Sequence, residues 1–520
     1  MSSAPVPAVK PSWFQRFLTL IERVGNLLPN PSTLFAFLAA LVVLLSWVFN
    51  RMGVSVIHPA TGQTMPVISL LNIEGLHRML LNLVPNFVGF PPLGTVLACL
   101  IGIAVAERTG LVTAGLRLIV LATPRRWLAS IVVFGGILSH SGADVGYVLF
   151  IPLGAAMFHA VGRHPLAGLA AAFAGVSGGF SANIVLGTID ALLAGITQAA
   201  AVVVRPGITV NAAANWYFLI AASVLITVVG TWVTEKIVEP RLGRYTGEAK
   251  PDEIKPLGAD EKRGLLYSVL AVVGVTLLVV WGVLPKDGWL VDATRQYASL
   301  RDQILGSYLI RGLIFFIFFY GLVAGLAYGI GARTIKNDND VIRGMDASVS
   351  TMGSYIVMAF FAAQFLAYFN WTNLGTIMAV KGAGVIKDLN LQDNPMLLMV
   401  SLVLFTAVIN LVIGSASAKW TLLAPIFVPM FMLLGYTPEL VQAAYRVGDS
   451  CTNIVTPLNQ YFPLILGFAV RYVPKTGIGT MLAMMIPYSI AFLISWTLML
   501  VAWIALGLPV GPGAGLFLPQ

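Results

Sequence analysis

A few charged residues lie inside otherwise apolar segments of the sequence, and they are the groups best suited to binding ions or polar solutes. They are Glu107, Asp144, Asp190, Lys381, Lys419, Arg446 and Asp449. A charge at mid-bilayer costs about 2.5 to 3.5 kcal/mol or more, so a charged residue inside a spanning segment is a functional candidate. Glu107 and Lys381 are typical of a membrane edge, and Asp144 follows a Ser-Gly pair as the cap of a loop does.

Arg446 and Asp449 are three residues apart, so on a helix they share a face and can pair with each other. The guanidinium of Arg446 offers a fork of donors that fits a substrate carboxylate. Asp449 is then a candidate for binding a cation or carrying a proton. The alternative is a structural ion pair that locks two helices, although a buried pair seldom adds stability over apolar packing. Asp190 is either part of this site or a capping or interfacial carboxylate.

Uncharged polar residues beside glycines form a second group of candidates. They are Asn183, Thr188, Asn410, Ser417, Asn453 and Thr456. Their oxygens, with carbonyls exposed where a helix unwinds, suit a hard cation such as Na⁺ better than a soft metal. Free N–H groups at half-helix starts suit an anionic substrate. The alternative is that small polar residues only allow close helix packing. Trp420 is either an interface anchor or a ring that stacks on an aromatic substrate.

The same glycine-rich motif occurs twice in the chain. Residues 181–185 (Ser-Ala-Asn-Ile-Val) reappear at 451–455 (Cys-Thr-Asn-Ile-Val), 270 residues later. Residues 93–98 resemble 374–379, and Pro152 has a counterpart in Pro425, at offsets of 281 and 273. Three matches in the same order indicate a duplicated unit of about 270 to 280 residues. Interrupted apolar segments at matching places in two halves indicate the binding site of a transporter.

The composition indicates a membrane protein. Of 520 residues, 58% are hydrophobic and only 10% charged, whereas a soluble domain carries about 25% charged residues. The net charge of +9 comes from short basic loops and fits a topology signal better than a nucleic-acid surface. Cys99 and Cys451, the two cysteines, are expected to be buried free thiols. The sequence has no nucleotide-binding loop or nucleophile motif, so we expect no enzyme activity and no ATP-driven transport.

Hydrophobic segments and basic loops predict an all-α polytopic membrane protein built as an inverted-topology repeat. The first thirty residues form a cytoplasmic N-terminal arm, and the basic loop 235–263 is also assigned to the cytoplasm. The first repeat is predicted at 31–235, with a re-entrant hairpin near 165–200. Residues 236–305 are predicted to form the charged loop, a linking helix and an external loop. The second repeat is predicted at 306–510, with re-entrant or broken segments near 372–390, 410–434 and 440–460. The arms of the hairpin are too short to cross a bilayer, which needs about 20 residues.

Five motifs, taken together and in order, resemble the AbgT family of p-aminobenzoyl-glutamate transporters, and in particular its MtrF-type members associated with sulfonamide efflux. The motifs are Gly162-Arg163-His164-Pro165-Leu166-Ala167-Gly168, Ser177-Gly178-Gly179-Phe180-Ser181-Ala182-Asn183, Gly187-Thr188-Ile189-Asp190, Gly414-Ser415-Ala416-Ser417-Ala418-Lys419-Trp420 and Tyr445-Arg446-Val447-Gly448-Asp449-Ser450. The resemblance implies a homodimer in the bacterial inner (plasma) membrane, with about nine transmembrane helices and two re-entrant hairpins per subunit.

The resemblance also implies roles for individual residues. Asp190, Ser417, Trp420, Arg446, Asp449 and Pro457 fall where the family has its transport residues, and Asn183 and Asn453 join them through the repeated motif. Asn410 and Asp449 fall where the family places a cation, here a candidate Na⁺. The chain departs from the family pattern at Ala191, where relatives have proline, and at Lys419, where they have a neutral residue. Lys419 is expected either to tune the charge preference for substrate or to snorkel.

These features predict a secondary transporter driven by an ion gradient, with no cofactor apart from a bound Na⁺ or a coupled proton. The resemblance implies import of p-aminobenzoyl-glutamate, a folate breakdown product, or export of sulfonamide antimetabolites, which would confer antibiotic resistance. The direction of transport and the choice between symporter and antiporter stay open. The alternatives are a transporter of dicarboxylates or other organic anions on a similar plan, which would not need Trp420, and a passive channel.

Overall fold

The computed structural model describes residues 29–57, 62–122, 124–139, 146–247, 249, 256–456 and 458–519. Within them the protein is almost wholly helical, and its one sheet is a two-stranded antiparallel hairpin. Seven helical segments are long and apolar enough to cross a membrane, which agrees with the polytopic all-α class. Six shorter apolar helices have 10 to 17 residues, below the length that a straight crossing needs. The expected total of about nine spans stays a prediction, because length alone gives seven in the described residues.

The helices of the first half of the chain hold one irregular polar stretch, or break, in place. Its elements are α2 (Pro31–Arg51), β1 (Ser55–Ile57), β2 (Thr64–Pro66), α3 (Ile73–Val88), α4 (Pro91–Arg108), α5 (Leu111–Leu121), η1 (Arg125–Trp127), α6 (Leu128–Leu138), η3 (Gly146–Phe150), α7 (Ile151–Ala160), α8 (Pro165–Phe173), η4 (Ala174–Gly178), α9 (Thr188–Ala201), α10 (Trp216–Val233), η5 (Thr234–Val238) and α11 (Glu239–Leu242). Helix α8 ends in the π-helical turn η4, and residues 179–187 then run without regular structure into α9. Such π turns are frequent at functional sites.

The sequence predicts a polar loop over 51–79, which contains Pro59, Gly62 and Pro66, and a span at 91–107, whereas in the structure residues 73–79 belong to helix α3. Asn72 caps the helix, because its side chain accepts a hydrogen bond from Gly75 N at 2.6 Å. Pro85 lies inside α3 and Pro91 opens α4, so the two prolines mark a bend between consecutive helices rather than the end of a loop.

The second half positions two more breaks. Its elements, after the linking helix α12 (Ala259–Val283) and the short helices α13 (Leu300–Gly306) and α14 (Tyr308–Arg311), are α15 (Leu313–Gly331), α16 (Asp338–Ser350), α17 (Gly353–Trp371), α18 (Leu374–Asp388), α19 (Pro395–Asn410), α20 (Ala416–Met432), α21 (Pro438–Thr452), α22 (Phe462–Tyr472) and α23 (Ile478–Ala505). Helix α18 is continuous across its segment. Helix α21 continues through Arg446 and Asp449 to Thr452, and the irregular stretch follows at 453–461.

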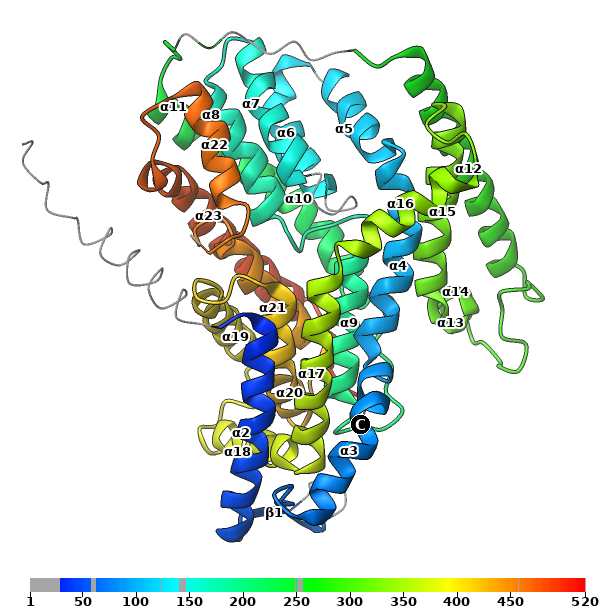
Figure 1. Cartoon of the computed structure of the whole chain (residues 1–520), viewed down its shortest axis with the longest axis vertical. Helices are drawn as coiled ribbons and strands as arrows, with labels where there is room; N and C mark the ends of the chain where they lie inside the picture. The colour runs from blue at the N-terminus through cyan, green and yellow to red at the C-terminus, as the bar shows by residue number, and fades with distance from the viewer. Residues whose placement is uncertain are drawn as a thin grey trace, which may run out of the picture.

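The two halves contain their elements in the same order, and the first helix of each half packs against a helix of the other half. Helix α2 packs against α17, and its counterpart α15 packs against α4. In Figure 1, α2 descends to β1 while α15 ascends from α14, and α4 ascends while α17 descends to α18. The two copies therefore run in opposite directions, as an inverted repeat requires. The 181–185 and 451–455 motifs occupy matching breaks. The resemblance of 93–98 to 374–379 does not follow this order, since it relates α4 to α18.

One close helix contact occurs in both copies. A Cβ at Gly175 would lie 2.2 Å from the Val133 carbonyl oxygen, and a Cβ at Gly448 would lie 2.3 Å from the Val403 carbonyl oxygen. The two carbonyls are 270 residues apart in the chain, and the two glycines 273. Only a residue without a side chain allows the backbones to approach this closely. The glycine in the Arg446–Asp449 motif therefore has a packing role.

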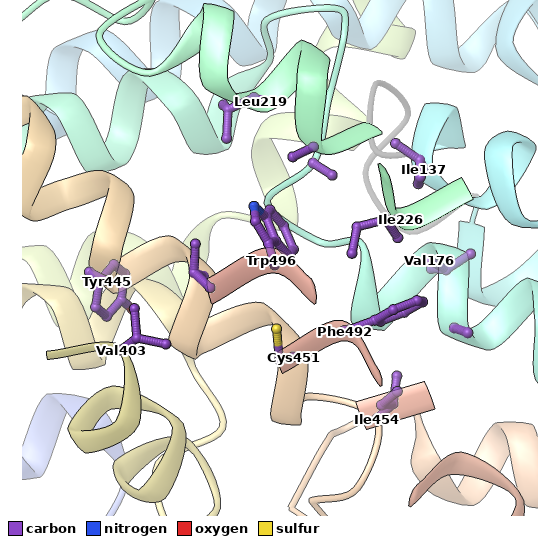
Figure 2. Packing of buried hydrophobic residues seen from close by; sticks show 14 of the residues in the cluster. Ile137, Val176, Leu219, Ile226, Val403, Tyr445, Cys451, Ile454, Phe492 and Trp496 are labelled. Atoms are coloured by element: carbon purple, nitrogen blue, oxygen red, sulfur yellow. The ribbon is translucent and has the colours of Figure 1, made fainter. Parts of the chain in front are cut away.

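Between the copies lies a core of buried apolar residues, to which α23 contributes large rings. Figure 2 shows Phe492 and Trp496 of α23 beside Cys451 and Ile454, next to the second break. All four are fully buried. Close packing of this kind holds the nearby polar residues in fixed positions. Cys99 and Cys451 are both buried and free, as the sequence predicts.

The chain after α23 folds back onto the protein. Thr437 N, at the cap of α21, donates to Leu516 O at 3.1 Å, and Leu518 N donates to Gly435 O at 2.8 Å. The Thr437 hydroxyl donates to Gly515 O at 2.7 Å. This C-terminal segment therefore anchors the start of α21.

Candidate functional site

A cavity of about 490 Å³ lies where the two repeats meet. From the first repeat it is lined by Phe180, Thr188, Ile189 and Leu192, and from the second by Gly414, Ser415, Ala416, Ser417, Asn453, Leu458, Asn459, Gln460 and Tyr461, among others. Its walls thus come from the break before α9, the break between α19 and α20, and the break after α21. A volume in this range suits a small organic molecule.

The two copies of the repeated motif contact each other beside this cavity. Ser181 N donates to the Ser450 hydroxyl at 3.1 Å, and Asn459 Nδ2 donates to the Ser177 hydroxyl at 3.1 Å. These bonds join segments about 270 residues apart in the sequence. The structure therefore brings the two motifs to one crevice.

Asp190 and Arg446 form an ion pair that joins α9 to α21. Arg446 Nη1 lies 2.7 Å from Asp190 Oδ1, and both side chains are buried. Asp190 Oδ2 accepts from Asn183 Nδ2 at 2.6 Å and from Gly187 N at 2.9 Å, so it also caps the start of α9. The spacing in the sequence suggested a pair between Arg446 and Asp449. In the structure, the partner of Arg446 is Asp190 of the other repeat.

The Arg446–Asp190 pair leaves several polar atoms without partners. Among the described residues, no hydrogen bond reaches Arg446 Nε, Arg446 Nη2, Asn183 Oδ1 or the Ser181 hydroxyl. A buried donor of a charged group is costly to leave unpaired. Two donors of one guanidinium fit the two oxygens of a carboxylate or sulfonyl group. The donors suit an anionic or strongly polar group, but neither Arg446 nor Asp190 lines the 490 Å³ cavity, so a ligand would reach them only after a local opening.

A second buried ion pair involves Asp449, one turn further along α21. Lys419 Nζ is 2.5 Å from Asp449 Oδ1, and both side chains are buried. The same ammonium donates to Asn410 Oδ1 at the end of α19. Asn410 Nδ2 donates to Asp449 O at 2.5 Å and to Asn453 Oδ1 at 2.9 Å. Asn410, Lys419, Asp449 and Asn453 thus form one network, and Lys419 does not snorkel to a surface.

Trp420 has a place that the sequence did not predict. Its side chain is fully buried, its ring lies 4.3 Å from that of Tyr445, and the two rings are inclined by 27°. Its Nε1 donates to the Thr197 hydroxyl at 2.8 Å. Trp420 is therefore not an interface anchor and does not line the 490 Å³ cavity. It holds α20 against α9 and α21.

The other candidate residues divide into those at the cavity and those elsewhere. Ser417 and Thr188 line the cavity. The Thr456 hydroxyl donates to Leu411 O at 3.2 Å and so ties two breaks together. Glu107 and Lys381 lie on α4 and α18 and do not line the cavity. Pro457 and Asp144 lie outside the described residues.

Comparison with known proteins identifies the family. Residues 16–518 match the model described as "AbgT putative transporter family". The chain belongs to the AbgT family. It is 38% identical over 517 residues to the p-aminobenzoyl-glutamate transport protein of Escherichia coli (strain K12), covering 99% of each chain.

Two solved AbgT structures resemble the fold closely. The Neisseria gonorrhoeae protein MtrF, described among antimetabolite efflux pumps, is 46% identical, with a TM-score of 0.89 over 96% of this chain and 100% of its own. The Alcanivorax borkumensis YdaH transporter, whose topology is described as unusual, is 42% identical, with a TM-score of 0.87 over 93% of this chain and 100% of its own. This AbgT protein is therefore a multi-pass membrane transport protein and not an enzyme.

The structure also shows a polar network in this AbgT protein that the sequence analysis did not include. The Thr197 hydroxyl donates to Gln442 Oε1 at 2.5 Å as well as accepting from Trp420. Gln442 Nε2 donates to Asn215 Oδ1 at 2.8 Å. The signal available in the sequence was a polar residue inside an apolar helix, since Thr197 and Gln442 are each in such a setting. Because their partners lie more than 200 residues away, spacing could not reveal the connection.

The described residues contain no cluster of three His, Cys, Asp or Glu side chains that could hold a metal ion. Any cation at this site would have to be bound by carbonyl, amide and single carboxylate oxygens.

Proposed function

We propose that this protein is a secondary transporter, driven by an ion gradient, that carries p-aminobenzoyl-glutamate or sulfonamide antimetabolites across the bacterial inner membrane. The names of the E. coli and N. gonorrhoeae relatives support this substrate class. The observation that carries the proposal is the Arg446 guanidinium, buried where the two repeats meet, with Nε and Nη2 unpartnered among the described residues.

The cavity offers partners for the other parts of such a substrate. Phe180, Tyr147 and Tyr461 present rings at its wall, and the rings of Tyr147 and Tyr461 stack at 4.1 Å. Ser417 and Asn453 supply hydroxyl and amide groups. A benzoyl ring packs favourably against such rings. In this proposal these cavity rings, and not Trp420, contact the aromatic part of the substrate.

The proposed arrangement in the membrane follows from charge and family. The basic loop 235–263 and the N-terminal arm lie in the cytoplasm under the positive-inside rule. The protein functions as a homodimer, as the family resemblance implies, and each subunit contains its own cavity. The Asp190–Arg446 pair joins the two repeats through buried charges.

Transport by reconstituted protein tests the proposal. We would measure the flux of p-aminobenzoyl-glutamate, a sulfonamide and plain glutamate into proteoliposomes under separately imposed proton and sodium gradients. We expect saturable, gradient-driven flux of the two aromatic compounds, and its loss in Arg446→Gln but not in Arg343→Gln, an exposed arginine on α16. Unsaturable flux would indicate a channel, and a preference for plain glutamate would indicate a dicarboxylate transporter.

A further inference from the structure

The Lys419 ammonium lies between the two residues at which the sequence analysis expected a cation. Its nitrogen is 2.5 Å from Asp449 Oδ1 and donates to Asn410 Oδ1. Lys419 extends from the first turn of α20, whereas Asn410 ends α19 and Asp449 lies on α21. Three elements therefore converge on one positively charged nitrogen.

The amide nitrogen of Asn410 is engaged as well, whereas Asp449 Oδ2 has no hydrogen-bond partner among the described residues. Asn410 Nδ2 makes its hydrogen bonds to Asp449 O, to the Thr452 hydroxyl at 2.9 Å and to Asn453 Oδ1 at 2.9 Å. The Asn410 amide is thereby fixed with its oxygen toward Lys419. A sodium ion between Asn410 and Asp449 would lie beside the ammonium, which already contacts Asn410 Oδ1 and Asp449 Oδ1.

The charge balance leads to the same conclusion. Asp190, Arg446, Lys419 and Asp449 are all buried and form two pairs, so their charges sum to zero. A sodium ion added to this group would give it a net positive charge in a region shielded from water. Uncompensated buried charge is strongly unfavourable. The residues present do not fit a sodium ion while Lys419 is charged and in place.

We infer that the Lys419 side chain is a tethered cation that takes the place of Na⁺ between Asn410 and Asp449, so that this protein binds no sodium ion there and a sodium gradient does not drive its transport. This inference specifies the ion side of the proposed function. It is tested by ion binding without substrate, so a wrong assignment of substrate would leave its outcome unchanged.

The test is the binding of ²²Na⁺ to purified protein, with three forms compared. We expect no saturable binding to the wild type. Lys419→Ala, which leaves the Asp449 carboxylate without its cation, is expected to bind one Na⁺ per chain and to become more heat-stable in NaCl than in KCl or choline chloride. The matched control is the double variant Lys419→Ala/Asp449→Asn, which lacks both charges and is expected to lose this binding and the selective stabilisation.

Two results would overturn the inference. The first is saturable Na⁺ binding by the wild type, which needs no variant to observe. The second is a folded Lys419→Ala protein that shows no response to Na⁺, because the ammonium would then not occupy a cation position. If Lys419→Ala folds only in NaCl, the inference is supported; if it fails to fold in any salt, the wild-type measurement decides.

Discussion

Helix α21 carries two buried ion pairs one turn apart, and they differ in which polar atoms they leave without a partner. The Lys419–Asp449 pair is embedded in hydrogen bonds from Asn410 and Tyr445, and its nitrogen has an acceptor on each of two neighbouring elements. In the Arg446–Asp190 pair, two guanidinium nitrogens have no partner among the described residues. The first pair thus leaves one carboxylate acceptor, Asp449 Oδ2, without a partner among the described residues, whereas the second leaves two guanidinium donors.

The difference shows that burial of a charged residue does not by itself identify a binding group. All four side chains are buried to nearly the same degree. What separates them is the number of donors and acceptors left over after the protein's own contacts are made. We expect the Arg446–Asp190 pair, which has spare donors, to determine substrate binding, and the Lys419–Asp449 pair to determine the preference for ions and the packing of α19, α20 and α21.

Replacing Arg446 is expected to have the largest effect. Arg446→Gln leaves Asp190 buried without its cation, which should destabilise the protein by about 3 to 5 kcal/mol and remove substrate binding. Thermal unfolding in detergent and equilibrium binding of p-aminobenzoyl-glutamate measure the two effects. The double variant Arg446→Gln/Asp190→Asn should recover most of the stability but none of the binding. Recovery of both would show that the arginine only balances charge.

Replacing Asp449 should affect stability by a somewhat smaller amount. The sequence alone predicts that Asp449→Asn removes coupled transport and leaves the protein folded. The structure adds a loss of about 3 kcal/mol, because the buried Lys419 ammonium then has only neutral oxygens around it. Substrate binding should be less affected than in Arg446→Gln. Wild-type unfolding temperature together with wild-type transport in Asp449→Asn would contradict the proposed roles of this pair.

A change at Trp420, a neutral neighbour of the Lys419–Asp449 pair, should lower stability less than the loss of either charge. Trp420→Phe keeps a ring against Tyr445 and removes only the hydrogen bond from Nε1 to Thr197. We expect a cost of about 1 kcal/mol in stability. Transport of aromatic and non-aromatic substrates should change by the same factor, since Trp420 does not line the cavity. A selective loss for aromatic substrates would show that Trp420 contacts them after all.

Removing an ion pair outside the membrane-spanning helices should have the smallest effect on stability. In the loop between α12 and α13, Asp292 contacts Arg311 at 2.8 Å and Arg295 at 3.2 Å. A hydrogen bond from the Thr294 hydroxyl, together with these charges, holds the pKa of Asp292 below its ordinary value of 3.8. Because the pKa is lower in the folded state, the ionised carboxylate stabilises the fold at pH values above the ordinary pKa. This contribution is lost as the pH falls through the folded-state pKa.

The difference in unfolding temperature between wild type and Asp292→Asn tests this expectation. It should be present at pH 7 and should close toward pH 3. A difference that stays constant over this range would show that the charge of Asp292 contributes nothing. Added salt should also reduce the difference, since exposed charges are screened.

Much of the fold and part of the site followed from the sequence. The repeated motif at 181–185 and 451–455 predicted the meeting of the two breaks, because a break inside apolar helices is tolerated only where it is buried or lines a cavity. The partners of Arg446 and Asp449 could not be predicted in the same way. Spacing along a helix shows which side chains share its surface, but not which other helix each will face. Asp190 and Lys419 come from other elements.

The local errors have equally specific causes. Residues 51–79 were assigned to a polar loop because they contain Pro59, Gly62 and Pro66, although Asn72 caps a helix that begins at Ile73. Trp420 was expected either to anchor at a membrane interface or to stack on an aromatic substrate. Its burial depends on Tyr445 and Thr197, and the latter is 223 residues away. The expected number of about nine spans awaits a measurement of topology.

The C-terminal segment has a consequence for how α21 can move. At Thr437 and Gly435 the start of this helix is tied to Leu516 and Leu518, whereas its far end at Thr452 opens into the irregular stretch 453–461. The tail therefore holds only the first turn of α21, while contacts with α9, α19 and α20 hold the rest of the helix. Shortening the tail, or joining a bulky fusion partner to it, would loosen this first turn rather than the cavity wall at Asn453.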